Sequence, residues 1–130
     1  MSAPLVRVSS GRRRWLVRVE DLQEVVPMMA LGQVEGLGGE CRGLLNLRGE
    51  LVPVFDKTDG EGSPSRFILV LRERGGRVGL LVDEVHEVLV PAAGQLVSRP
   101  VGAGRTRSMA LVGEELFTLL EPGEVVAHGG

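Results

Sequence analysis

The chain has 130 residues, which is enough for one domain or for two small lobes that share a core. Its composition is 43% hydrophobic and 25% charged, as in globular proteins, and no apolar run approaches the roughly 20 residues of a membrane-spanning helix. The net charge is −2 and the arginines are scattered among the acidic residues, so the sequence predicts no nucleic-acid-binding face. A single cysteine excludes an internal disulfide, and the first residues lack the apolar core of a signal peptide. We therefore expect a cytoplasmic protein without membrane insertion.

The first predicted element is a hairpin. Apolar runs at 5–8 and 15–19 flank a short polar turn, which predicts a half-exposed β-hairpin. Residues 20–25 then start with two acids and place Leu22 and Val25 three positions apart, which predicts a single helical turn ended by Pro27. Residues 28–31 are a candidate short strand. Residues 32–39 contain four glycines and are typical of an irregular loop.

The central stretch, 41–56, predicts a second hairpin. Its two apolar runs flank Arg48-Gly49-Glu50, where a glycine supplies the backbone freedom that a tight turn needs. Pro53 lies inside the second run, so that strand should be a sheet edge or carry its proline at a bulge. Arg48 is thereby held at the hairpin tip, where its donors suit a carboxylate or carbonyl cluster on a partner. A solvated turn arginine is the alternative interpretation of the same spacing.

The second half of the chain repeats the first after a polar linker at 57–66. Apolar runs at 67–71 and 78–82 repeat the first hairpin, and residues 82–89 match 19–26 in residue type at every position except Gln23 against His86. The stretch from Leu111 also resembles the stretch from Leu47. Three matches in order at almost one offset predict two lobes that arose by duplication, at about 4–58 and 67–121. Each is too small to be stable alone, so we expect the lobes to pack together. The second lobe should be more buried because its strands are almost wholly apolar.

The last predicted elements are short. Residues 96–98 are a candidate strand, residues 100–107 a loop with glycines and arginines, and the runs at 109–112 and 116–120 a final hairpin. The remaining residues, 124–130, are too few for a substantial helix.

The sequence contains no clear catalytic or metal-binding pattern. His86 and His128 are isolated and Cys41 has no neighbouring cysteine, so we expect no metal and no cofactor. The acidic residues occur as adjacent pairs, which point apart on a strand or helix and do not converge on a substrate. Cys41 and His86 would make a hydrolase or isomerase only if the fold brought them within hydrogen-bonding reach.

A chain of β-lobes without catalytic residues is more typical of a binding module than of an enzyme. The candidate surfaces are the Arg48 tip with Asn46, the segment 22–25, and the seam between the lobes. A seam often forms an apolar groove, in which a partner helix would place side chains one turn apart.

Three motifs resemble one known family. The central hairpin follows the pattern G-(aliphatic)-x-N-L-R-G with a later P and D, which is met by Gly43, Asn46, Leu47, Arg48, Gly49, Pro53 and Asp56. An aliphatic-Gln-Glu-aliphatic segment is met by residues 22–25, and a Val-Asp-x-Val segment by residues 82–85. In these motifs the chain resembles the CheW-like family, the coupling proteins of bacterial chemosensory arrays, over about residues 5–120.

The resemblance implies an all-β fold of two packed, SH3-like, five-stranded β-barrel lobes with short helical turns. It implies a non-enzymatic adaptor that links chemoreceptor cytoplasmic tips to the regulatory domain of a CheA-type histidine kinase. Carried over by motif, the partner-binding residues are Arg48, Asn46, Gly49, Gly43, Leu22, Glu24 and Val25. Kinase docking in the family uses the region near residues 28–39, where this chain has glycines in place of a proline-bearing segment. The alternative is a receptor-binding member that does not couple directly to the kinase, and a piece of a larger signalling protein is a further possibility.

Overall fold

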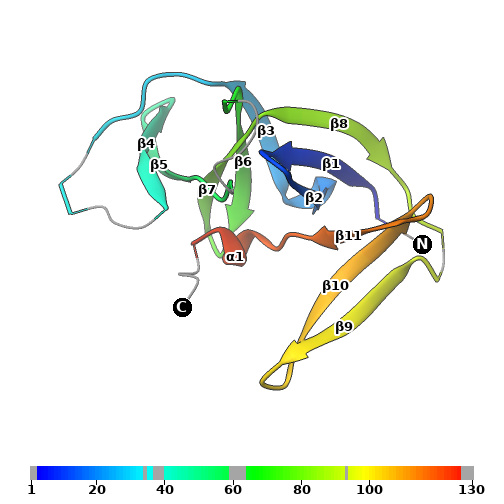
Figure 1. The fold of residues 1–130 in the computed structure, drawn as a ribbon. Coiled ribbons are helices and arrows are strands. Elements are labelled where there is room, and N and C mark those ends of the chain that lie inside the picture. The colour runs from blue at the N-terminus through cyan, green and yellow to red at the C-terminus, as the bar shows by residue number, and fades with distance from the viewer. Residues whose placement is uncertain (1–2, 34, 37–39, 59–63, 93, 127–130) are drawn as a thin grey trace.

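The structure, a computed structural model, describes residues 3–33, 35–36, 40–58, 64–92 and 94–126. These residues are mostly β-strand, with one 3-10 turn and one single-turn helix (Figure 1). The elements are β1 (Leu5–Ser10), β2 (Arg13–Arg18), η1 (Val19–Asp21), β3 (Leu22–Pro27), β4 (Cys41–Leu47), β5 (Glu50–Phe55), β6 (Phe67–Glu73), β7 (Gly76–Val82), β8 (Glu84–Leu89), β9 (Leu96–Gly102), β10 (Arg105–Val112), β11 (Glu115–Leu119) and α1 (Pro122–Val126).

The strands form two sheets, which confirms the predicted two-lobed all-β fold. The first sheet has six strands in the order β8-β1-β2-β11-β10-β9, and the second has five in the order β3-β6-β7-β5-β4. The predicted five strands per lobe are therefore found in the second sheet only. Among the described residues, β9 is the strand of the first sheet that has no counterpart in the second.

Each sheet combines strands from both halves of the sequence. The β1–β2 hairpin pairs with β8 from the second half, and the β6–β7 hairpin pairs with β3 from the first half. The second hairpin of each half also joins a strand of the other half. Strand β11 of the β10–β11 hairpin pairs in parallel with β2, and β5 of the β4–β5 hairpin pairs in parallel with β7. The equivalent strand orders agree with the predicted duplication. The sheets nevertheless do not follow the sequential division at 4–58 and 67–121, because the two repeats exchange strands.

The main hydrophobic cluster contains residues of both sheets. Its fully buried members include Val8 and Val17 of the first sheet and Leu69, Leu71 and Leu80 of the second. Since successive strand residues point to opposite faces, Ile68 and Val70 of β6 fill a second cluster with β4 and β5. Strands β6 and β7 are thus buried on both faces, as expected from their apolar sequence. The expectation of greater burial is wrong for β8 and β9 of the same half, whose residues are half-buried or exposed. The burial of β6 and β7 ties the two sheets into one structure.

The segment predicted as a helical turn is mostly a strand. Only Val19–Asp21 is helical, and Leu22–Pro27 continues as β3. The spacing of Leu22 and Val25 fits a helix locally, but pairing with β6, for example Val25 opposite Leu69, satisfies the backbone in an extended form. The matching segment after β7 is likewise a strand, β8.

One strand prediction and one loop prediction also need correction. Residues 28–31 form no strand, and the chain instead makes an isolated bridge between Gly32 and Leu44. The stretch 100–107 was expected to be a loop but is largely the β9–β10 hairpin, which turns through Ala103 and Gly104 at positive φ. Glycines at the turn explain the mistake, because they lower the apparent strand propensity on both sides.

Pro53 lies in an interior strand, and the ladder around it explains why it is tolerated. The two-residue turn makes Leu47–Glu50 the closing pair of the hairpin, so alternation points the Pro53 nitrogen away from β4. On that other side, β5 pairs with β7 only at Val54 and Phe55. The missing N–H of Pro53 therefore removes no hydrogen bond between strands. At Pro53 the side of β5 that faces away from β4 is unpaired, so β5 behaves there as the predicted edge strand.

Candidate functional site

The tip of the β4–β5 hairpin is a tight turn made by Arg48 and Gly49. Both residues have positive φ, 51° and 90°, which is the signature of a type I′ turn. Glycine adopts this conformation freely, whereas a residue with a side chain rarely does. The Asn46 side chain supports the turn, because its Oδ1 accepts a hydrogen bond from the Gly49 N–H at 2.9 Å. Asn46 and Gly49 therefore fix the point from which the Arg48 side chain starts.

The Arg48 guanidinium lies against Glu24 of β3. Its Nη2 is 2.5 Å from Glu24 Oε1, so the pair joins the two outer strands of the second sheet. The Arg48 side chain nevertheless keeps 69% of its surface exposed, against 27% for Glu24. The hydrogen bond from Arg48 lowers the pKa of Glu24 from its ordinary value of 4.5 and raises the pKa of Arg48. The tip thus presents an accessible guanidinium whose direction a carboxylate sets.

This pair gives the tip a defined pH dependence. Because the pKa of Glu24 is lowered in the folded state, the Arg48–Glu24 pair stabilises the fold fully at pH values above the ordinary value of 4.5. This stabilisation is lost as the pH falls through the lowered pKa of Glu24. We expect Arg48→Gln to move the pKa of Glu24 back up towards its ordinary value, because the donor that favours the carboxylate is weakened. An NMR titration of the Glu24 carboxyl in both proteins measures this. An unchanged pKa would show that the pair is absent in solution.

The remaining predicted residues have different positions. Val25 follows Glu24 in β3 and is exposed, but alternation along the strand points it to the opposite face. Leu22 is half-buried and packs against the main cluster. Gly43 is buried at a bulge of β4, where an added Cβ would lie 2.7 Å from the carbonyl oxygen of Gly32. The structure therefore brings Arg48, Asn46, Gly49 and Glu24 together. Gly43 lies away from this group and allows the close packing of Gly32 against β4.

Sequence reasoning did not single out the two methionines after β3. Met28 and Met29 are each 43% exposed, and the Met28 N–H is fixed by the Arg66 carbonyl at 2.8 Å. Exposed methionines adapt well to protein partners. They begin the stretch 28–39 that the family resemblance implied for kinase docking. Residues 34 and 37–39 of this stretch lie outside the described residues.

The family of the chain follows from a match over nearly its whole length. Residues 4–129 match the model of the CheW-like domain. The chain belongs to the CheW-like family. A solved structure, the CheW scaffolding protein of Thermoanaerobacter tengcongensis, superimposes with a TM-score of 0.79 at 22% identity, covering 93% of this chain and 90% of that one. The likeness shows that the CheW-like fold is shared. No curated protein sequence matches the chain.

In this CheW-like fold, Cys41 and His86 lie on different sheets. The Cys41 thiol contacts the Gly43 carbonyl at 3.8 Å, while His86 Nε2 lies 3.0 Å from Ser9 Oγ and 3.4 Å from a Glu84 oxygen. Neither contact joins the cysteine to the histidine. Within the described ranges, no group of three His, Cys, Asp or Glu side chains could hold a metal ion. No helix in the same ranges combines the length and the hydrophobicity of a membrane-spanning segment. His128 lies outside these ranges.

The seam between the CheW-like lobes is polar at its surface. A hollow of about 400 Å³ lies there between β2, the β6–β7 turn and α1, and its lining includes Arg18, Asp21, Arg72, Glu73 and Glu121. The apolar side chains at the seam are instead packed inside the main cluster. The predicted apolar groove is therefore not found at this hollow.

Proposed function

We propose that the protein is a non-enzymatic adaptor in a bacterial chemosensory complex. It binds the cytoplasmic tips of chemoreceptors and links them to the regulatory domain of a CheA-type histidine kinase. Membership of the CheW-like family supports a chemotaxis scaffold in general. The observation that carries the finer proposal is the exposed Arg48 guanidinium, fixed on a two-residue turn and oriented by Glu24.

Arg48 is suited to recognising a partner because it is already ordered. Asn46 holds the turn and Glu24 occupies one side of the guanidinium, so binding immobilises few further rotatable bonds. The remaining N–H donors are available to carboxylates or carbonyls at the end of a receptor helical hairpin. The proposed absence of catalysis rests on membership of the CheW-like family. The separation of Cys41 and His86 onto different sheets argues only against a site that uses these two side chains.

A second candidate keeps receptor binding and removes direct coupling to the kinase. It is favoured by the glycines of the stretch 32–39, which stand where the family resemblance implies a proline-bearing segment for kinase docking. Titration with a kinase regulatory domain separates the two candidates. Micromolar binding, about −8 kcal/mol, would reject the second candidate, and no measurable binding would support it.

The first candidate predicts a large effect of Arg48→Glu on receptor binding. Reversing the charge puts a carboxylate beside Glu24 and removes the donors that face the partner, so we expect at least about a tenfold weaker complex. Calorimetric titration with a purified receptor cytoplasmic fragment measures this. Arg74→Glu is a matched control, because Arg74 and Gly75 form a two-residue turn of the same kind in the β6–β7 hairpin, at φ 38° and 77°. Unchanged binding by Arg48→Glu, or equal losses in both variants, would count against the proposed site.

A further inference from the structure

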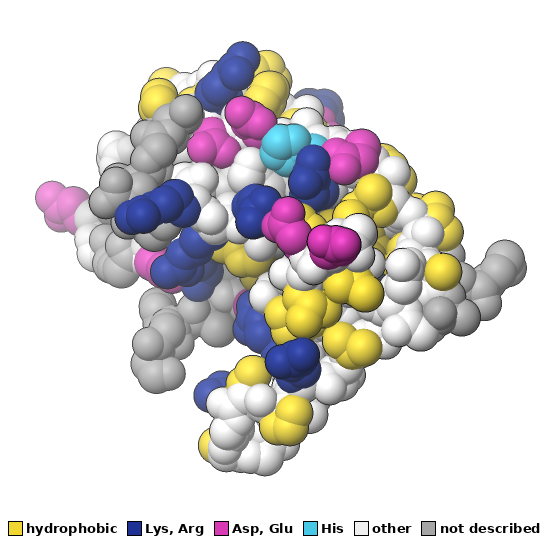
Figure 2. All heavy atoms as spheres, turned by 45° about the vertical axis from the view of Figure 1, so that its right-hand side comes forward, with side chains coloured by type: hydrophobic (Ala, Val, Ile, Leu, Met, Phe, Trp, Pro, Cys, Tyr) yellow, Lys and Arg dark blue, Asp and Glu magenta, His cyan; other side chains and the backbone are white. Residues whose placement is uncertain are grey.

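Strand β9 is an outer strand of the first sheet and is unusually open. Within the described part of the chain it pairs with β10 alone, and each of its residues from Leu96 to Gly102 is exposed. With β10 it forms a ribbon that extends beyond the rest of the molecule (Figure 1). Exposed apolar side chains lie along it, and Figure 2 shows hydrophobic side chains gathered on the projecting part. Proteins usually shorten or cover such edges, because the unpaired backbone can add another strand.

The register shows which backbone groups of β9 are free. The Leu111 N–H donates to the Gln95 carbonyl at 2.9 Å, so this pair is of the hydrogen-bonded kind. Alternation then gives Val97 and Arg99 hydrogen-bonded positions opposite β10. Leu96 and Ser98 point both their N–H and their carbonyl away from β10, and Pro100 points its carbonyl the same way. The free edge therefore offers donors and acceptors in the spacing of a strand.

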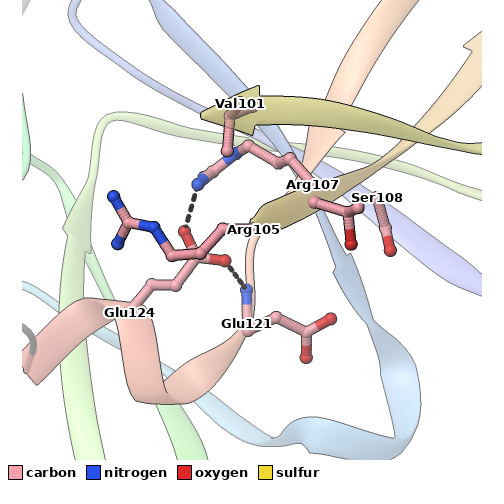
Figure 3. A pocket seen from close by; sticks show the side chains of 7 residues that line it. Val101, Arg105, Arg107, Ser108, Glu121 and Glu124 are labelled. Atoms are coloured by element: carbon pink, nitrogen blue, oxygen red, sulfur yellow. Dashed lines mark hydrogen bonds and ion pairs between the residues drawn. The ribbon is translucent and has the colours of Figure 1, made fainter. Parts of the chain in front are cut away.

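The charge of the ribbon differs from that of the chain. Residues 95–112 contain three arginines, Arg99, Arg105 and Arg107, and no acidic residue, although the whole chain has a net charge of −2. Arg107 is bound to Glu124 of α1 at 2.5 Å, across a hollow of about 340 Å³ (Figure 3). No ion pair with the described residues is found for Arg99 or Arg105. The ribbon is thus pinned to α1 through Arg107 and keeps a positive potential beside the open edge.

We propose that the free edge of β9 binds an extended acidic segment of a partner protein as an additional β-strand. The backbone of Leu96, Ser98 and Pro100 supplies the ladder, and Arg99 attracts a carboxylate on one face of the added strand. Val97 lies two positions before Arg99 in the regular part of β9, so it lies on the same face and favours an apolar residue next to that carboxylate. This inference does not depend on the chemosensory assignment.

A second copy of the chain fits this edge less well. Pairing β9 with its own copy would bring together two ribbons that each carry arginines and no acidic residue, so no carboxylate would face Arg99. Pro100 would also leave the partner strand without one hydrogen bond at each end of the pairing. The charge of the edge therefore favours an acidic partner.

The test uses the whole protein and a model peptide, acetyl-Val-Glu-Val-Glu-Val-Glu-amide. On saturation we expect the amide hydrogens of Leu96 and Ser98 to become protected from exchange by NMR, because they enter a new ladder. Ser98→Pro removes an outward N–H without breaking a hydrogen bond to β10 and should weaken binding about fivefold, whereas Ser98→Ala, which keeps the N–H, should not change it. Arg99→Glu should weaken binding about tenfold or more, and Arg13→Glu, on a strand separated from β9 by β11 and β10, should have little effect.

Three results would overturn the proposal. The first is no binding of the acidic peptide to the native protein, or equal binding of the matched peptide with lysines in place of glutamates. The second is peptide binding during which the Leu96 and Ser98 amides exchange as fast as in the free protein. Equally contradictory would be unchanged peptide affinity in both Ser98→Pro and Arg99→Glu, when thermal melting shows that both variants are folded. The third is a dimer in sedimentation whose Leu96 and Ser98 amides are already protected, which would assign the edge to a second copy.

Discussion

Gly43→Ala is expected to lower the free energy of unfolding by about 3 kcal/mol, combining backbone strain with a steric clash. Gly43 has φ +147°, and an added Cβ would lie 2.7 Å from the Gly32 carbonyl oxygen and 2.9 Å from Leu31 Cβ. The obstacle is backbone held by the Gly32–Leu44 bridge, so it cannot rotate away as a flexible side chain would. Residues 31–33 cross β4 so closely that only glycine fits at position 43, which explains the glycine of the family motif there. Urea denaturation followed by circular dichroism measures the change.

Gly76→Ala is the matched control for this prediction. Gly76 also belongs to a strand, but its φ is not in the positive range and its nearest obstacle, the Glu73 carbonyl oxygen, would lie at an ordinary 3.5 Å. We expect a change within about 0.5 kcal/mol for Gly76→Ala. Similar small effects at both positions would show that residues 31–33 do not cross β4 as closely as described.

Leu80→Ala should be at least as destabilising, by about 4 kcal/mol, because it removes a fully buried side chain from the cluster shared by both sheets. Leu80 lies in β7 opposite Leu69 of β6 on one side and Phe55 of β5 on the other. A cavity here is felt by both sheets, so the protein should still unfold in one transition, shifted to lower denaturant. Circular dichroism and Trp15 fluorescence should report the same midpoint.

Leu51→Ala is the corresponding surface control. The Leu51 side chain is 62% exposed in β5, so its truncation should change stability by no more than about 0.5 kcal/mol. Two separate transitions in Leu80→Ala, only one of them shifted, would contradict the exchange of strands between the repeats. That outcome would favour the sequential lobes expected from the sequence.

Local features of the fold could be predicted from the sequence, and non-local pairing could not. The turn at Arg48 and Gly49 could be predicted because a short polar stretch with a glycine separates two apolar runs. The duplication could be predicted because matching segments recur in the same order in both halves. The pairing of β3 with β6 joins residues 40 or more positions apart, for example Val25 and Leu69, and nothing in either segment identifies its partner. For this reason the exchanged strands, and the strand at Leu22–Pro27, were missed.

The candidate site shows the same limit. Asn46 and Gly49 are three positions apart and bond to each other within the turn, so their contribution to the turn could be predicted from the local motif. Arg48 and Glu24 were both expected from family motifs, but their ion pair exists only because the sheet brings β3 near the β4–β5 tip. The open edge of β9 was missed because glycines near 102–104 were interpreted as a loop.

The central claim is that the tip formed by Arg48, Gly49, Asn46 and Glu24 contacts the chemoreceptor. The most direct measurement is an NMR titration of the labelled protein with a receptor cytoplasmic fragment, following backbone amides. We predict the largest shifts at Gly49 and Glu24, with little change at Gly75 in the two-residue turn of the β6–β7 hairpin. Saturating binding that leaves Gly49 and Glu24 unshifted, with changes confined to Gly75 or to β9, would contradict it.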